Sequence, residues 1–270
     1  MKKTLTLVLL FFSIHAFADW PIGKKRALIN LSYNYYTVNK YYNGAGLKTN
    51  FTQGDVFTAQ SIGLGWIYGL GRYVNLIVNV PLVYQSAIIE GSQLAKAGAG
   101  DAQMGLSFHL PSKTLKSFFT LKALAITPLY NNYQKPYLGY GSNGLLLGTG
   151  YSFGLAPKTF CALEATYTRY FADDGTGPDQ IGYNATVGTQ TGNYVYWIAS
   201  FGGMISKSTN KTFSSNLGFN KDFDYGKTTL AIGKRITRTT TMYLQGFYFP
   251  FGHNAGEGKG GSLSIAVKIP

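Results

Sequence analysis

Apolar and polar residues alternate with a period of two along most of this chain. The segment 62–68 has a bulky residue at every second position, the glycine-rich turn 69–72 follows it, and the segment 74–82 alternates again. Successive side chains of a β-strand point to opposite faces, so two alternating runs joined by a glycine turn predict a β-hairpin.

The two faces of these predicted strands differ in kind. In the run 74–82, Val and Leu residues share one face, whereas Asn75 and Asn79 lie on the other. A strand that covered the core of a soluble protein would carry many charges on its opposite face, and this face carries few. The combination is typical of a strand with lipid on one side and an enclosed polar lumen on the other.

The same pattern recurs to the end of the chain. We predict twelve spanning strands at about 26–38, 62–68, 74–82, 101–110, 115–127, 144–153, 160–171, 181–187, 195–201, 227–236, 240–249 and 262–269. The run 213–219 also alternates, but bacterial barrels have even strand numbers with both termini in the periplasm. We therefore expect 207–226 to be an outer excursion, such as an extended hairpin. The predicted fold class is all-β, a transmembrane antiparallel up-and-down β-barrel with short periplasmic turns and longer outer loops.

Several segments between these strands are expected to be irregular. Long outer loops are predicted at 39–55, 85–100, 128–143 and 252–261. Pro81 lies within a predicted strand and has no backbone N–H to donate. We expect it to mark a bulge or the end of regular pairing.

The N-terminus predicts export. Lys2 and Lys3 precede the apolar run 5–14, and Ala16-Phe17-Ala18 has the small-x-small pattern of a signal peptidase site. We expect a cleaved signal peptide at 1–18 and a single barrel domain at 19–270. No later segment approaches the ~18 consecutive apolar residues that a transmembrane helix requires.

Charge changes this picture in two ways. Charged residues make up 13% of the chain, against about 25% in typical soluble proteins. Together with the export signal, this low charge indicates the bacterial outer membrane. The net charge of +13 is spread through turns and loops rather than along a basic helix, so nucleic acid is not an expected partner. We expect contact with outer-membrane lipid and lipopolysaccharide, and a mild preference for anionic solutes.

Short segments of the chain are similar to a known family. A strand ends at Val80-Pro81, a loop follows, and Gly98-Ala99-Gly100-Asp101 opens the next strand. Together with the closing glycine-rich loop before a short last strand, these segments resemble the outer-membrane β-barrel transporters of the phenol meta-degradation pathway. The resemblance extends over most of the predicted mature chain, and it implies a barrel that takes up small, often aromatic compounds.

Three motifs suggest chemistry that the context disfavours. The segment 139–144 matches GxGxxG but follows a loop and precedes a strand, whereas a dinucleotide site needs a strand before and a helix after. Ser107 and His109 share one strand face, as in outer-membrane lipases. A lipase also needs an orienting carboxylate or amide and a nucleophile on the lipid side, whereas this pair is expected to face the lumen.

Acidic residues near the outer end could form a hydrolase or cation site. Asp173, Asp174 and Asp179, with His253 on another outer loop, resemble the Asp/His sites of omptin-type proteases or could hold Ca²⁺. Omptins have ten strands, however, and Gly/Asp turns commonly use such residues. Cys161 is the single cysteine and is interpreted as a small apolar strand residue. No metal and no cofactor is expected.

The lumen is the candidate site. Twelve strands predict a narrow bore, between the filled interior of eight-stranded barrels and the water channel of sixteen. Lysine is costly in hydrocarbon, which favours an inward orientation for those in strands; such Lys and Glu residues could alternatively serve only to cross-link the wall. The predicted lining is Asn75, Asn79, Lys116, Phe118, Thr120, Lys122, Glu164, Thr166, Asn184 and Tyr196.

These observations favour a non-enzymatic outer-membrane channel for passive uptake of small, aromatic or amphipathic solutes. Two alternatives stay open. One is a barrel enzyme, such as a lipase-like or omptin-like hydrolase. The other is a surface barrel whose loops bind lipopolysaccharide or partners.

Overall fold

A computed structural model describes residues 20–51, 56–89, 92–130, 138–172, 175, 177–209 and 221–270. The predicted signal peptide 1–18 and the alternating run 213–219 lie outside these described residues. No helix among the described residues is long and apolar enough to cross a membrane.

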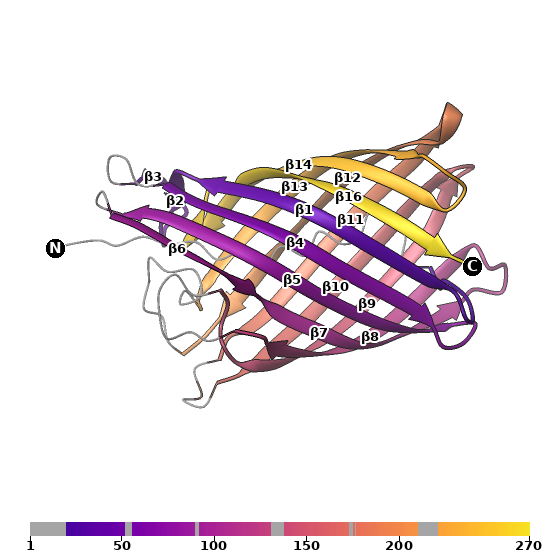
Figure 1. Ribbon diagram of the computed structural model, residues 1–270, viewed down its shortest axis with the longest axis horizontal. Coiled ribbons are helices and arrows are strands. Elements are labelled where there is room, and N and C mark those ends of the chain that lie inside the picture. The colour runs from indigo at the N-terminus through magenta and orange to yellow at the C-terminus, as the bar shows by residue number, and fades with distance from the viewer. Residues whose placement is uncertain are drawn as a thin grey trace.

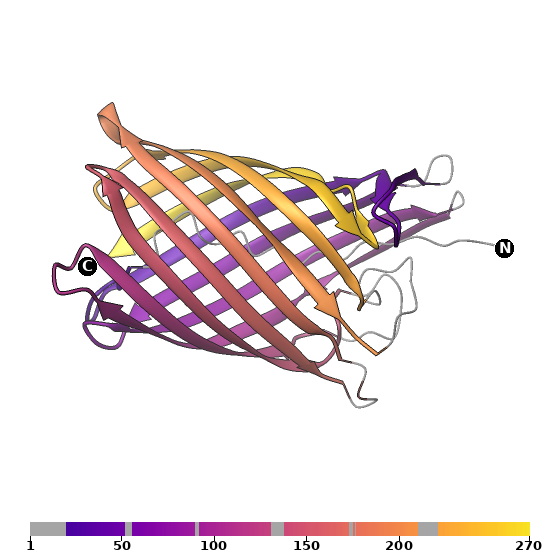
Figure 2. The same ribbon diagram turned by 180° about the vertical axis from the view of Figure 1, so that it is seen from behind.

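Twelve long strands form one closed antiparallel barrel (Figures 1 and 2). Each strand pairs with the next along the chain, and β1 pairs with both β4 and β16, which closes the wall. The predicted fold class and strand number are therefore confirmed. The wall strands are β1 (Ala27–Val38), β4 (Val56–Gly69), β5 (Val74–Ile89), β7 (Asp101–Pro111), β8 (Ser117–Pro128), β9 (Asn143–Ala156), β10 (Thr159–Phe171), β11 (Asp179–Thr191), β12 (Val195–Lys207), β13 (Phe223–Arg235), β14 (Thr240–His253) and β16 (Lys259–Ile269).

The two ends of the barrel carry different connections. The short turns 70–73, 112–116, 157–158, 192–194 and 236–239 all lie at the end where β16 finishes, and the longer connections lie at the other end (Figure 1). Bacterial barrels have short turns on the periplasmic side, so this end is the periplasmic one.

The outer end is more regular than the sequence predicts. The expected loop 85–100 is wrong, because β5 continues to Ile89 and pairs with β6 (Ser92–Ala99). Within the predicted loops 39–55 and 252–261, β2 (Lys40–Tyr42), β3 (Lys48–Asn50) and β15 (Ala255–Gly256) form a small sheet, which we name the outer cap. Strand β13 also begins four residues before the predicted Lys227, at Phe223.

Pro81 ends one pairing, as expected. β5 pairs with β7 only from Val74 to Asn79, and from Leu82 onward it pairs with β6 on the same edge. The Pro81 carbonyl accepts a hydrogen bond from Gly100 N–H at 2.8 Å, where the chain passes from β6 into β7. The proline therefore occupies the point at which the edge changes partner, where no N–H is required.

The distribution of apolar side chains is the reverse of that in a soluble protein. Leu64 is 50% exposed and Leu230 is 66% exposed on the outer wall, whereas Asn34, Asn75 and Ser107 are buried inside the barrel. Because exposed leucines repeat around the outer wall while amides and hydroxyls are enclosed, lipid is the solvent that fits the outer face. This distribution supports the predicted lipid-facing orientation of the apolar face of each wall strand.

Leu230 lies mid-strand on the outer wall and offers a test of this assignment. Leu230→Arg is expected to lower the free energy of unfolding in lipid by roughly 2–4 kcal/mol, because arginine is costly at the bilayer midplane. Leu47, which is also 66% exposed but lies in the outer cap region, is the matched control. Leu47→Arg should change stability by less than about 0.5 kcal/mol. Denaturant titration of the protein in liposomes measures both, and equal effects would contradict a lipid-facing wall.

Candidate functional site in the barrel lumen

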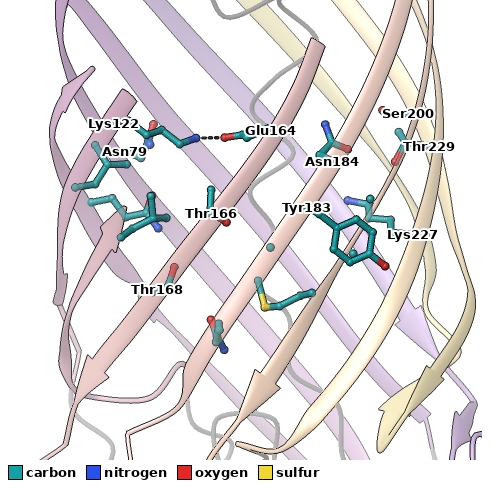
Figure 3. Close-up of a pocket in the computed structure, with 18 of the residues that line it drawn as sticks. Asn79, Lys122, Glu164, Thr166, Thr168, Tyr183, Asn184, Ser200, Lys227 and Thr229 are labelled. Carbon is teal, nitrogen blue, oxygen red and sulfur yellow. Dashed lines mark hydrogen bonds and ion pairs between the residues drawn. The ribbon is translucent and has the colours of Figure 1, made fainter. Parts of the chain in front are cut away.

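Two cavities lie within the barrel. The central cavity, of ≈ 250 Å³, is lined from β5 round to β14 and is drawn in Figure 3. The periplasmic cavity, of ≈ 570 Å³, lies toward the short-turn end. Ile77, Asn79 and Lys122 line both cavities, so the two spaces meet at these residues.

An ion pair joins two strands on the inner face of the barrel, at the wall of the central cavity. Lys122 on β8 pairs with Glu164 on β10, which is the contact marked in Figure 3. Between these strands, Gly148 on β9 faces Lys122 in the ladder, and a Cβ at this glycine would lie 2.4 Å from Lys122 Cε. Because glycine has no side chain, the lysine can lie flat across β9 to reach the carboxylate.

A second lysine enters the central cavity from a different part of the wall. Lys227 on β13 lies at a register shift between β13 and β14, and its Nζ is 4.6 Å from the centre of the Phe247 ring. Such a cation–π contact stabilises a partly desolvated cation. Glu164 is the one carboxylate among the described residues that line this cavity, against two lysines, so the lining carries a net positive charge.

Ser107 and His109 form a compact polar cluster near the periplasmic third of the lumen. The His109 Nε2 atom lies 3.0 Å from Ser107 Oγ and 2.9 Å from Asn75 Nδ2, and Nδ1 lies 3.0 Å from Thr120 Oγ1. The group that orients the imidazole is thus a hydroxyl rather than a carboxylate. His109 and Ser107 are each only 1% exposed. These contacts satisfy buried polar groups, and none of these three partners carries the charge that would stabilise an imidazolium during catalysis.

Aromatic residues fill one side of the lumen near the outer end. Tyr36 and Phe57 from β1 and β4 pack with Phe247 and Phe249 from β14, and Tyr225 packs against this group. The Phe249 and Tyr225 rings are stacked 4.5 Å apart at an interplanar angle of 7°. We name this group the outer aromatic cluster. Tyr225 also lines the central cavity, so the cluster lies next to that cavity on its outer side.

The connection between β8 and β9 covers another part of the outer mouth. The Tyr140 hydroxyl accepts a hydrogen bond from Gln180 Nε2 at 2.9 Å, and the Tyr140 ring packs edge-on against Tyr170 at 4.7 Å. Burial raises the pKa of Tyr140, so its hydroxyl stays protonated. Nearby, the Tyr130 hydroxyl donates to Asp101 Oδ1 at 2.7 Å. These contacts hold the described part of this connection against the rim.

The periplasmic cavity combines apolar walls with cations. Trp20 and Ile22 lie in its mouth, so the segment before β1 forms part of the lining. Ile22 also packs with a buried apolar group that includes Leu28, Ile198 and Tyr243. The basic residues that line this cavity, in addition to Lys122, are Arg26, Arg235, Arg238 and Lys268. No Asp or Glu side chain is found among the described residues that line it.

The outer cap is attached to the barrel through Glu257. Lys48 Nζ donates to Glu257 Oε1 at 2.6 Å, and the Tyr248 hydroxyl donates to the same oxygen. Partial burial tends to raise the pKa of the Glu257 carboxyl, but the hydrogen bonds from Lys48 and Tyr248 outweigh it. The pKa is therefore lowered from its ordinary value.

This shift makes the attachment of the outer cap dependent on pH. A carboxyl with a lowered pKa stabilises the folded state fully above its ordinary pKa of 4.5, and the contribution is lost as the pH falls through the lower, folded value. We expect a fluorophore on Leu47→Cys, in a Cys161→Ala background, to gain mobility when the pH drops from neutral to below about 4. Glu257→Gln should give the same gain at neutral pH. Unchanged anisotropy in both experiments would contradict this role.

The predicted lining residues occupy several places. Lys122, Glu164, Thr166 and Asn184 border the central cavity, Asn79 borders both cavities, and Asn75 and Tyr196 border the periplasmic one. Thr120 is buried against His109, and Phe118 lies 6.3 Å from Trp20 at the periplasmic mouth. The prediction that Lys116 lines the lumen is wrong. This residue is exposed in the turn 112–116, because β8 begins only at Ser117.

The outer acidic residues do not gather into the predicted hydrolase-like site. Asp173 and Asp174 lie outside the described residues. The Asp179 carboxylate accepts a hydrogen bond from the Tyr167 hydroxyl at 2.6 Å, and His253 Nδ1 lies 2.8 Å from Asp224 Oδ1. Among the described residues, no three His, Cys, Asp or Glu side chains are placed to share a metal ion.

The sequence prediction did not identify several residues of the lumen. Lys227, Gln103 and Thr168 line the central cavity, and Arg235 lines the periplasmic one. Gln103 lies on the same strand face as Ser107, and Thr168 on the same face as Glu164. The alternation of the sequence could therefore have predicted that both residues point into the lumen. The position of Arg235 follows from its hydrogen bond to the Tyr196 hydroxyl at 3.0 Å, which joins residues distant in sequence.

No family model and no curated protein sequence matches this chain. Its structure is similar to the COG4313 outer membrane channel from Pseudomonas putida F1, with a TM-score of 0.73 and 13% identity over 94% of this chain and 100% of that one. The NanC porin gives a TM-score of 0.53 and 8% identity over 90% of this chain and 99% of that one. The translocator domain of the autotransporter NalP from Neisseria meningitidis gives a TM-score of 0.50 and 6% identity over 91% of this chain and 88% of that one.

The closed wall, its apolar outer face and these similarities define an outer-membrane β-barrel protein. The chain accordingly belongs in the bacterial outer membrane, and it shares its fold with channel, porin and translocator barrels.

Proposed function

We propose that this protein is a channel for passive passage of small amphipathic solutes across the outer membrane, with a preference for anions. The observation that carries the proposal is the meeting of the two cavities at Asn79 and Lys122, which gives a route along the barrel axis. Both cavities have apolar and basic linings, with Glu164 as the one Asp or Glu side chain among the described lining residues. The similar structure from Pseudomonas putida F1 is an outer membrane channel, which agrees with this function.

The lining favours a solute with an apolar body and a negative charge. Trp20, Tyr196 and Tyr243 offer aromatic surface in the periplasmic cavity, while Arg235 and Arg238 offer positive charge. A volume of ≈ 570 Å³ is within the range of small-molecule sites. An aromatic or short aliphatic carboxylate satisfies both parts of this lining, in agreement with the resemblance to transporters of aromatic compounds.

Planar-bilayer recording and liposome swelling test the proposal. We expect small single-channel conductance, a reversal potential that indicates anion preference, and faster swelling with benzoate than with a neutral sugar of similar size. A purified, folded protein that neither conducts nor admits any solute would overturn a channel function. Conductance without anion preference would overturn the assigned solute class alone.

A barrel hydrolase is less well supported. Thr120 stands where the orienting carboxylate of a catalytic triad would be, and Ser107 is almost completely enclosed. Esterase activity of the purified protein that is lost in Ser107→Ala would favour the hydrolase over the channel.

A further inference from the structure

Acidic residues among those described are unevenly distributed between the two ends of the barrel, whereas basic residues lie at both. The acidic residues among those described are Asp101, Glu164, Asp179, Asp222, Asp224 and Glu257. Except for Glu164, which lies within the wall, they belong to the outer end. At the periplasmic end, every charged side chain among the described exposed residues is a lysine or an arginine. Three of these cations, Arg26, Arg238 and Lys268, line the periplasmic cavity. Those beside the turns and the start of β1 that lie outside its lining are Lys24, Lys25, Arg72, Lys113, Lys116, Lys158 and Lys234. We name these seven the basic rim.

The basic rim is distributed around the barrel. Arg72 lies in the turn between β4 and β5, Lys113 and Lys116 in the next turn, and Lys158 in the turn between β9 and β10. Lys234 lies near the end of β13. Because consecutive wall strands are neighbours in the sheet, these positions lie on different sides of the circumference. A single folded partner would contact one side, whereas a membrane surface surrounds the whole barrel.

Aromatic residues place the basic rim at the depth of lipid headgroups. Trp66 and Tyr68 stack at 5.8 Å near the periplasmic end of β4. Trp197 is 53% exposed near the periplasmic end of β12. Such outward-facing rings mark the membrane interface in barrels. The rim residues lie beyond these rings toward the short turns, so their cations reach the level of the phosphates.

The rim cations are not used for ion pairs among the described residues. The pairs found there are Lys48–Glu257, Lys122–Glu164, Arg169–Asp179, Lys207–Asp222 and His253–Asp224, and none includes a rim residue. Arg72 instead lies over the Tyr73 ring at 5.2 Å. Exposed ammonium groups that face no carboxylate are suited to contact with external anions.

We propose that the basic rim binds anionic phospholipid headgroups of the periplasmic leaflet and thereby enriches them around the barrel. Three observations support this interaction surface: charge of one sign, distribution around the circumference, and position just beyond the interfacial aromatic rings. The attraction is electrostatic and acts within a Debye length of ~10 Å at 0.1 M salt, so it weakens as ionic strength rises. It does not depend on the channel function proposed above.

Tryptophan quenching by brominated lipids tests this directly. The chain has three tryptophans, and Trp20→Phe leaves Trp66 and Trp197, which report on lipid beside the rim. In phosphatidylcholine vesicles at low salt, brominated phosphatidylglycerol should quench severalfold more effectively than the same mole fraction of brominated phosphatidylcholine. High salt should remove the difference.

Matched charge variants complete the experiment. Arg72→Gln/Lys113→Gln/Lys116→Gln/Lys158→Gln removes four of the seven rim charges and should reduce the preference for phosphatidylglycerol severalfold. Lys40→Gln/Lys96→Gln/Lys221→Gln/Lys259→Gln removes the same charge from the outer end and should retain it, with folding of both verified by circular dichroism. Equal quenching by the two lipids in the parent protein would overturn the proposal, as would a preference that persists undiminished in the rim variant. Either result would leave the proposed channel function untouched.

Discussion

Phe249→Ala is expected to raise the single-channel conductance severalfold. Phe249 is 1% exposed and belongs to the outer aromatic cluster, where it stacks on Tyr225. Truncating the ring removes apolar volume from the outer aromatic cluster, which lies inside the barrel between the central cavity and the outer end. The loss of packing should also lower the free energy of unfolding by about 3–5 kcal/mol. Planar-bilayer recording measures the first effect and denaturant titration the second.

Phe251→Ala is the matched control for Phe249→Ala. Phe251 lies two residues further along β14 but faces outward and is 48% exposed. Its truncation should leave conductance unchanged, because it removes surface that contacts lipid. If both variants conduct like the parent protein, the outer aromatic cluster does not limit passage.

Glu164→Gln is expected to produce the second large effect, a shift of the reversal potential toward greater anion preference. The substitution removes the one Asp or Glu side chain among the described residues of the central cavity, so the charge of this lining becomes more positive. Breaking a fully buried ion pair costs several kcal/mol, but Glu164 keeps about a quarter of its side-chain exposure. We therefore expect a smaller loss of stability, about 1–3 kcal/mol.

Two further variants define the selectivity experiment. Lys122→Gln should move the reversal potential in the opposite direction, since it removes a positive charge from the lining and keeps the negative charge of Glu164. Asp179→Asn changes the charge equally but lies at the outer end of β11, where Asp179 accepts a hydrogen bond from Tyr167. Its effect should be small. A shift in Asp179→Asn as large as in Glu164→Gln would show that selectivity arises outside the central cavity.

Much of the wall could be predicted because the membrane imposes a strict pattern. Each spanning strand must present apolar residues to lipid at every second position, so Leu64 and Trp66 could be assigned to the outer face from sequence alone. The alternation also predicts that Lys122 and Glu164 point inward. It left open whether such residues line a solute path or only cross-link the wall as ion pairs. Tyr36 lies on the same strand face as Asn34, so the alternation also predicts that this residue of the outer aromatic cluster points inward.

Other features depend on information that alternation does not contain. The parity of Lys116 is inward, but a turn occupies 112–116, with Leu115 at φ 56°, and the strand begins one residue later. The segment at Trp20 and Ile22 has no periodic pattern that would place it in the periplasmic mouth. Beyond the membrane, water accepts either face of a strand, so β6 and the outer cap lack the alternation that identifies the wall.

The central claim is that solutes pass through the lumen where the two cavities meet, and Asn79 lies at that point. In a Cys161→Ala background, we expect a bulky thiol reagent to reduce the single-channel conductance of Asn79→Cys strongly. The same reagent should leave Leu230→Cys, on the outer wall, unaffected. Full conductance through Asn79→Cys, with complete modification verified by mass spectrometry, would contradict a path through the lumen.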